Sequence, residues 1–202
     1  MATGKEIKAR IKSVKNTGKI TKAMELISTV KMKKAQDSAQ SARPFAIDAA
    51  RLMQHLGDIS SLVGIPTTEK KILILLIASN KGLCGGYNVN LFKTVAELVG
   101  PNITQYDFVT AGKRAREFIA RTGGNLVGDF SNELSDTITP KEAKKVSRFL
   151  QSLYRDGSYS SVRVVYSHFI SAINQKATVK SLFPMSAEEI DAFLALIYSK
   201  SG

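Results

Sequence analysis

The sequence predicts an α/β protein with two parts: a long N-terminal helix of the coiled-coil type and an open, mainly parallel, Rossmann-like sheet domain. Two observations lead to this. Apolar residues recur at steps of three and four in the N-terminal quarter, and short apolar strands alternate with helical segments afterwards. We expect the long basic helix at residues 1–57, a linker at 58–70, the sheet domain at 71–184 and the start of a further helix at 185–202.

The first helix should begin at Thr3 and end at Gly57. Thr3 and Glu6 have the spacing of a capping box, and glycine commonly follows the last turn of a helix. Pro44 lacks a backbone N–H and should kink the helix without ending it. An apolar seam of mostly small side chains predicts close packing against a partner helix. It consists of Met32, Ala35, Ala39, Ala42, Ala46, Ala49, Met53 and Leu56.

Positive charge is concentrated on this helix. Up to Arg51 it carries twelve lysines and arginines against four acidic residues, a net charge of +8 out of +12 for the whole chain. Like charges at this density repel one another unless an acidic surface faces them, so an acidic partner is expected. Nucleic acid, anionic lipid and acidic protein all qualify, and a solvated lysine-rich face is the alternative.

The segments after residue 70 alternate between strand and helix. The apolar run Lys71–Ala78 predicts a strand that helices cover on both faces. Further strands are expected at 106–110, around Leu126 and Val127, at 161–167 and at 178–183. This alternation is typical of an open, mainly parallel sheet.

The helices of this domain have recognisable ends. One follows the loop Ser79–Gly86 and stops at Gly100, a second spans 113–121, and a third runs from a capping box at Thr139–Glu142 to about Arg155. Ser186 and Glu189 should cap the last one. The expected inward faces are Val89, Phe92, Ala96 and Val99 in the first helix, Ala115, Phe118 and Ile119 in the second, and Ile190, Phe193, Leu194 and Ile197 in the last.

Several features could suggest an enzyme. The loop Ser79–Gly86 lies between a strand and a helix, where α/β proteins bind phosphates, but its spacing fits neither standard glycine-rich motif. A tight turn that needs glycine is the favoured interpretation. Cys84, the only cysteine, is interpreted as a packing residue, because the sequence places neither His55 nor His168 near it. We expect no catalytic residue, cofactor or metal, since no ligand cluster has suitable spacing.

Other classes fit less well. No aromatic residue precedes Phe45, so the basic helix lacks the stacking platforms of single-strand nucleic-acid binders. The longest apolar run is too short to span a bilayer, so any membrane role would be peripheral. A single cysteine rules out a disulfide within the chain and favours a reducing compartment.

Three stretches carry a resemblance to a known family. The stretch Ile11–Leu26, continued by Lys31–Gln36, closely resembles the N-terminal helix of the gamma subunit of F-type ATP synthases. The stretch Ser79–Asn90 is similar to that family's S-D-R-G-L-C-G-G-x-N-x-N segment, with Asn80 and Lys81 in place of Asp and Arg. Tyr166–Pro184 resembles its later strand pair.

The resemblance implies a non-catalytic central rotor stalk that couples proton flow to ATP synthesis or hydrolysis. The implied partners are the alpha and beta subunits, the epsilon subunit and the membrane c-ring, with no nucleic acid and no small-molecule substrate. The implied location is peripheral, on the inner face of an energy-coupling membrane, such as the cytoplasmic side of a bacterial cell membrane. The residues expected to face these partners are Lys19, Lys22, Met24, Lys31, Lys33 and Lys34.

One departure from the family is visible. Family members continue into a second long helix that packs against the first. Either this chain is a truncated form or its partner helix comes from elsewhere, and the apolar seam from Met32 to Leu56 favours truncation. Two alternatives remain open from the residues alone: a nucleotide-binding α/β enzyme with an oligomerising helix, and a basic nucleic-acid-binding protein. Nucleotide binding by the chain, or salt-dependent binding to duplex DNA, would separate them.

Overall fold

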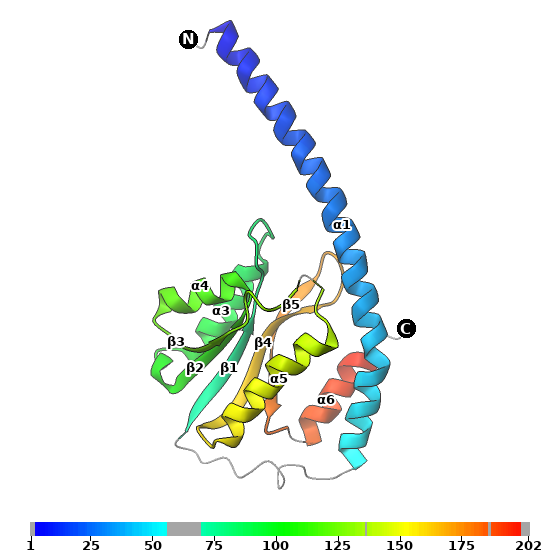
Figure 1. Cartoon of the computed structure of the whole chain (residues 1–202), viewed down its shortest axis with the longest axis vertical. Helices are drawn as coiled ribbons and strands as arrows, with labels where there is room; N and C mark the ends of the chain where they lie inside the picture. Colours follow the sequence, from blue (N-terminus) through cyan, green and yellow to red (C-terminus); the bar gives the residue numbers. More distant parts are fainter. Residues whose placement is uncertain (1–2, 56–69, 136, 186, 199–202) are drawn as a thin grey trace. The chain divides into compact units, whose positions relative to one another are not determined.

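The computed structural model describes residues 3–55, 70–135, 137–185 and 187–198. The chain forms two compact units, residues 1–49 and 50–202. Helix α1, Gly4–His55, supplies the first unit, and its last residues belong to the second (Figure 1). The expected helix end at Gly57 and nearly all of the expected linker lie outside the described residues.

Helix α1 confirms the long N-terminal helix. At its start the backbone N–H of Thr3 donates to the Glu6 carboxylate at 2.8 Å, which is one half of the predicted capping box. The helix has 52 residues and continues through Pro44, as expected when one proline removes a single hydrogen bond.

The second unit is built on a five-stranded sheet with the strand order β3-β2-β1-β4-β5. The first four strands pair in parallel and β5 runs antiparallel to β4, so the predicted open, mainly parallel sheet is confirmed. The strands are β1 Lys71–Ile77, β2 Tyr106–Ala111, β3 Asn125–Asp129, β4 Tyr159–Phe169 and β5 Gln175–Phe183.

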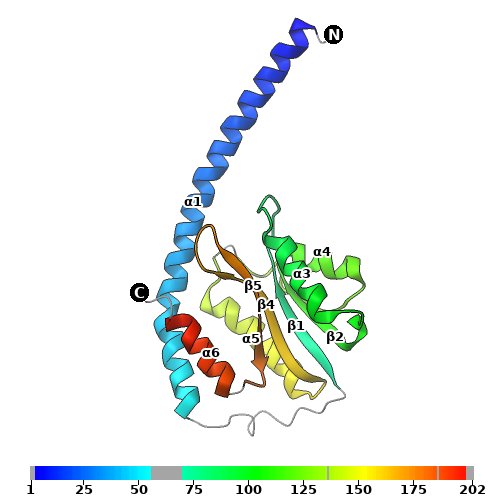
Figure 2. The ribbon, with the colours of Figure 1, turned by 180° about the vertical axis from the view of Figure 1, so that it is seen from behind.

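Helices cover both faces of this sheet (Figures 1 and 2). Alternate residues of β1 point to opposite faces: Ile74 joins an apolar cluster with helices α3 and α4, whereas Leu73 joins a second cluster with α5. Because the central strand is buried on both sides, it consists almost entirely of aliphatic residues. The helices are α3 Tyr87–Val99, α4 Lys113–Thr122 and α5 Pro140–Arg155, with a short 3₁₀ turn η1 at Ile103–Gln105.

The inward face of α4 was predicted correctly, and that of α3 was predicted in part. In α4, Ala115 and Ile119 are fully buried. In α3, Val89 and Ala96 are exposed, while Leu91, Val95 and Val99 are buried. Phe92 and Val99 of the predicted face pack in the apolar cluster on the sheet, where Leu91 and Val95 take the places expected for Val89 and Ala96. Leu91 and Val95 are larger than the two residues they displace and so remove more apolar surface from water.

The C-terminal helix α6, Ala187–Tyr198, packs within the second unit beside the last turns of α1 (Figures 1 and 2). Ile190 and Leu194 are buried as predicted, and so is Ala50 of α1. The Gln54 amide donates a hydrogen bond to the Asp191 carboxylate. Ser186 and the side chains of Phe193 and Ile197 lie outside the described residues.

Hydrogen bonds fix the start of α5. Thr139 accepts from the backbone N–H of Glu142, and the Glu142 carboxylate accepts from the backbone N–H of Thr139, which confirms the second capping box. Hydrogen bonds from the side chain and backbone of Thr139 and from the backbone of Ser135 lower the pKa of Glu142 to about 2. The carboxylate therefore stays ionised and keeps the cap closed at neutral pH.

A buried carboxylate connects four strands of the sheet. Asp107 of β2 accepts from Lys71 of β1, Asn125 of β3 and Tyr159 of β4, each at 2.9 Å. Burial alone would raise the pKa of Asp107, but these hydrogen bonds together lower it below its ordinary value. Burial of the phenol and its hydrogen bond to Asp107 raise the pKa of Tyr159 to about 12. Each carboxylate oxygen is satisfied, which is the condition for burying it.

Candidate partner-binding helix

The six residues expected to bind partners all lie on α1, and all six side chains are exposed. Helical spacing divides them between two faces. Met24, Lys31 and Lys34 share one face, together with Ile20 and Ile27. The other face is formed by Lys19, Lys22, Leu26, Val30 and Lys33.

Two of the lysines are neutralised by neighbours on the helix. The Nζ atom of Lys22 lies 3.0 Å from the Glu25 carboxylate, and that of Lys33 lies 2.8 Å from Asp37. These pairs are three and four residues apart, a spacing from which they could have been predicted. Both pairs are solvent-exposed and contribute little to stability, so either lysine can exchange its partner for another acid.

The helix also exposes much apolar surface. Along residues 4–34 of α1, nine large apolar side chains are 42–72% exposed. A stretch this apolar on a protein surface usually marks a binding site, since isolated apolar residues are common but continuous patches are not. The nine are Ile7, Ile11, Val14, Ile20, Met24, Leu26, Ile27, Val30 and Met32.

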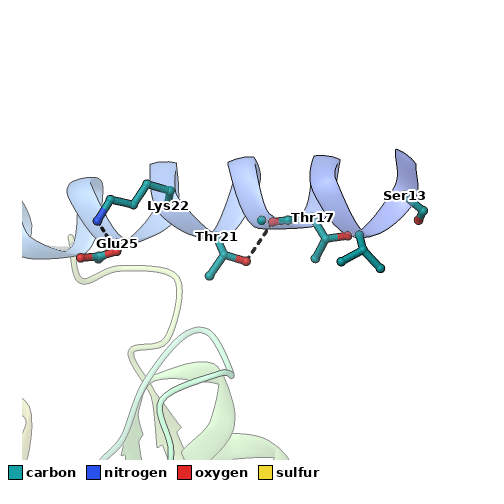
Figure 3. A pocket seen from close by; sticks show the side chains of 7 residues that line it. Ser13, Thr17, Thr21, Lys22 and Glu25 are labelled. Atoms are coloured by element: carbon teal, nitrogen blue, oxygen red, sulfur yellow. Dashed lines mark hydrogen bonds and ion pairs between the residues drawn. The ribbon is translucent and has the colours of Figure 1, made fainter. Parts of the chain in front are cut away.

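A shallow groove runs along a third side of the helix, around Gly18 (Figure 3). Gly18 leaves a gap, because no atom would lie within 4 Å of a Cβ at this position. The Thr21 hydroxyl donates to the backbone carbonyl of Thr17 at 2.9 Å and is thereby turned towards the helix. This groove was not predicted from the sequence. It is lined by Ser13, Val14, Thr17, Gly18, Thr21, Lys22 and Glu25.

The loop after β1 is occupied with its own hydrogen bonds. The Asn80 side chain accepts from the backbone N–H of Lys113 at 3.0 Å, and the Ser79 carbonyl accepts from that of Arg114 at 3.1 Å. These hydrogen bonds tie the loop to the start of α4, the helix that follows β2. Gly85 has a φ of 57°, which supports the interpretation as a tight turn.

The interpretation of Cys84 as a buried packing residue is wrong, because its side chain is exposed. The loop turns outward before α3, and the sulfur lies 3.1 Å from the Asn88 amide nitrogen and 3.9 Å from the Ser79 hydroxyl. His168 lies on β4 opposite Lys176 of β5, and the side chain of His55 is outside the described residues.

Two features are absent from residues 3–55, 70–135, 137–185 and 187–198. No group of three or more histidine, cysteine, aspartate or glutamate side chains among them is placed to hold a metal ion. Within the same residues, no helix combines the length and apolar character needed to cross a bilayer.

Comparison with known proteins identifies the family. A family model described as ATP synthase matches residues 3–200. The ATP synthase gamma chain of Leptospira biflexa is 37% identical over 198 residues, which cover 94% of this chain and 68% of that protein. The chain belongs to the ATP synthase gamma-chain family. Gamma chains of Bdellovibrio bacteriovorus and Opitutus terrae are 36% and 38% identical, and the matches cover 65% and 62% of their lengths and 92% of this chain.

Solved structures agree with this gamma-chain fold. A chain of the Tetrahymena thermophila mitochondrial ATP synthase central stalk and c-ring superposes with a TM-score of 0.65 at 22% identity, covering 88% of this chain and 87% of that one. A chain of the Euglena gracilis mitochondrial ATP synthase rotor gives 0.60 at 17% identity, covering 96% and 68%. At these identities the likeness establishes the fold alone.

Proposed function

We propose that this chain is the gamma subunit of an F-type ATP synthase and forms its central rotor stalk. In this role α1 lies within the alpha-beta hexamer, and the sheet domain contacts the epsilon subunit and the membrane c-ring. The observation that carries the proposal is the exposed, basic and apolar surface of α1 in a chain of the gamma family.

The charge and the apolar surface of α1 call for the same kind of partner. Lys19, Lys31 and Lys34 are exposed on a helix with a large positive excess, next to apolar side chains such as Ile27. An acidic collar with apolar recesses satisfies both properties, since charge complementarity guides assembly and apolar burial stabilises it.

The three sides of α1 offer different chemistry, which supports a rotary role. One carries Met24 with Lys31, the opposite one carries the paired Lys22 and Lys33, and the third is the groove around Gly18. Turning such a helix inside a ring of subunits changes the contacts that each subunit makes. A difference in contact free energy between orientations is what coupling between distant sites requires.

The proposal assigns ATP chemistry to other subunits of the complex and a coupling role to this chain. The loop Ser79–Gly86 supports this assignment, because its spacing fits neither standard glycine-rich phosphate motif. The proposed location is peripheral, on the inner face of an energy-coupling membrane, such as the cytoplasmic face of a bacterial cell membrane.

The test reverses three charges on α1 in the assembled complex. We expect Lys22→Glu, Lys31→Glu and Lys33→Glu together to leave chain stability within about 1 kcal/mol, because exposed ion pairs contribute little. Against an acidic collar, the same changes should abolish assembly or uncouple ATP hydrolysis from proton pumping, since like charges at an interface cost several kcal/mol. Urea unfolding and ATP-driven acidification of inverted membrane vesicles measure the two effects.

The matched control reverses three exposed cations on α5, namely Lys141, Lys144 and Arg148. It should leave assembly and proton pumping unchanged. Normal assembly and pumping by the α1 triple variant at low and high salt would show that its lysines are merely solvated and would overturn the proposal.

A further inference from the structure

The hairpin between β4 and β5 presents apolar side chains at its tip, residues 169–175. Ile173 is 98% exposed, and Ile170 is 43% exposed. The tip lies at the end of two paired strands of the sheet, so its position is fixed by the β4–β5 ladder.

Hydrogen bonds hold the turn in one conformation. The backbone N–H groups of Ile170 and Ser171 donate to the Asn174 carbonyl at 3.1 and 2.9 Å, and the Asn174 N–H donates to the Ser171 hydroxyl at 3.0 Å. The Gln175 amide donates to the carbonyls of Ser171 and Ala172. The turn is therefore preorganised with Ile173 pointing outward, which reduces the entropy cost of binding.

The surroundings of the tip are cationic. No acidic residue occurs between Asp156 and Glu188, whereas the two strands carry Arg163, Lys176 and Lys180. Lys176 is exposed just beyond the tip, and no acidic partner for it is found in the described part of the chain. An apolar tip with cations behind it is complementary to an apolar recess with an acidic rim.

We propose that residues 169–175 dock onto an acidic protein surface of a neighbouring ATP synthase subunit, with Ile173 in an apolar recess and Lys176 facing a carboxylate. This inference rests on the proposed function, because the partner is sought within that complex. It adds a contact surface on the sheet domain that is separate from the six residues of α1.

The chemistry of the tip favours a protein partner over a lipid surface. Side chains that anchor proteins at membrane interfaces are typically Trp and Tyr, and the tip has neither. Two isoleucines bury less apolar surface than one myristoyl chain, which by itself gives only marginal membrane binding.

The test places a photo-reactive p-benzoylphenylalanine at Ile173, or at Met24 of α1, in the chain as it is expressed in its own cells. After illumination, purified ATP synthase is analysed for cross-linked peptides. The expected result is an adduct from residue 173 to a subunit peptide with net negative charge. A matched probe at Val89, which is 66% exposed on α3, should give no such adduct.

A second measurement changes the apolar side chain and the charge of the tip by substitution and follows retention of the chain in the complex. Ile173→Asp should weaken retention of the chain in the complex by about tenfold or more, the scale expected for losing one buried isoleucine contact. Val89→Asp should change retention less than about twofold. Lys176→Glu should weaken it most at low salt, because the attraction is screened as salt rises.

Three results would each overturn the inference. The first is the absence of a protein adduct at residue 173, and the second is an adduct from this residue to lipid. The third is binding of the wild-type chain to anionic vesicles that is abolished by Ile173→Asp. The Met24 probe distinguishes failure of this inference from failure of the proposed function. An adduct from Met24 to an alpha or beta subunit without one from residue 173 leaves the proposed function standing. A chain that is missing from purified ATP synthase overturns both.

Discussion

The two units of this chain treat apolar residues in opposite ways. The sheet domain buries them in two clusters on either side of β1, where Ile74 and Leu76 are fully buried. Along residues 4–34 of α1, by contrast, Val14 and Val30 are about 70% exposed. One unit has its own core, and the other has apolar surface that only a partner can cover.

This difference separates stability from function. The free energy of folding in the sheet domain comes from burial and from satisfied polar groups such as Asp107. A helix without packing is marginal in water, even when its sequence favours helix. We therefore expect the exposed half of α1 to be stably helical only where an assembly supplies the missing contacts.

The largest contrast is expected from the same substitution in the two units. Leu91 of α3 is fully buried and Leu26 of α1 is 60% exposed. Leu91→Ala should lower the free energy of unfolding by about 2–5 kcal/mol, because it removes apolar contacts and leaves a cavity. Leu26→Ala should change it by less than about 0.5 kcal/mol. Urea unfolding of both variants checks this, and equal losses would contradict the comparison.

A smaller effect is expected from the buried carboxylate. Asp107→Asn should cost about 1–3 kcal/mol at pH 7, because a charged hydrogen-bond acceptor between strands is lost. The pKa of Asp107 is lowered on folding, so its contribution is present above the unfolded value and is lost as the pH falls through the folded value.

The difference in unfolding free energy between wild type and Asp107→Asn should therefore shrink between about pH 5 and pH 3. Urea titrations at several pH values measure it. A matched substitution at an exposed acid, Asp156→Asn, should show no comparable difference. A constant difference for Asp107→Asn over this range would contradict the assignment.

The smallest effect is expected from a helix cap. Thr139→Ala removes the side-chain acceptor for the Glu142 N–H and should cost about 0.5–2 kcal/mol. Thr139→Ser retains the hydroxyl and should restore most of the loss. Thermal unfolding distinguishes the two variants, and identical melting temperatures would show that the cap is not formed in solution.

Most of the fold could be predicted from local signals. The apolar run of β1, the glycine after α4 and the capping box at Thr139 each fix one element by short-range chemistry. Only Phe92 and Val99 of the buried face of α3 were predicted, because overlapping stripes with helical spacing compete and packing on the sheet selects Leu91 and Val95. The exposure of Cys84 depends on the path of a loop, which residue type does not encode.

The candidate site was predictable only in part. The excess of lysine predicts that α1 binds partners, which stays a prediction, and all six expected residues are exposed. Their division between two faces follows from helical geometry and could have been derived. The groove around Gly18 depends on threonine rotamers, such as that of Thr21, which the sequence leaves open.

The most direct test of the comparison is backbone hydrogen exchange in the free, monomeric chain and in the assembled complex. We predict that amides of residues 4–34 exchange rapidly in the free chain. Amides of β1 and β2 should exchange only through global unfolding, with an opening free energy equal to that of unfolding. Assembly should then slow exchange along residues 4–34 by orders of magnitude. Protection of these amides equal to that of β1 in a proven monomer would contradict the central claim.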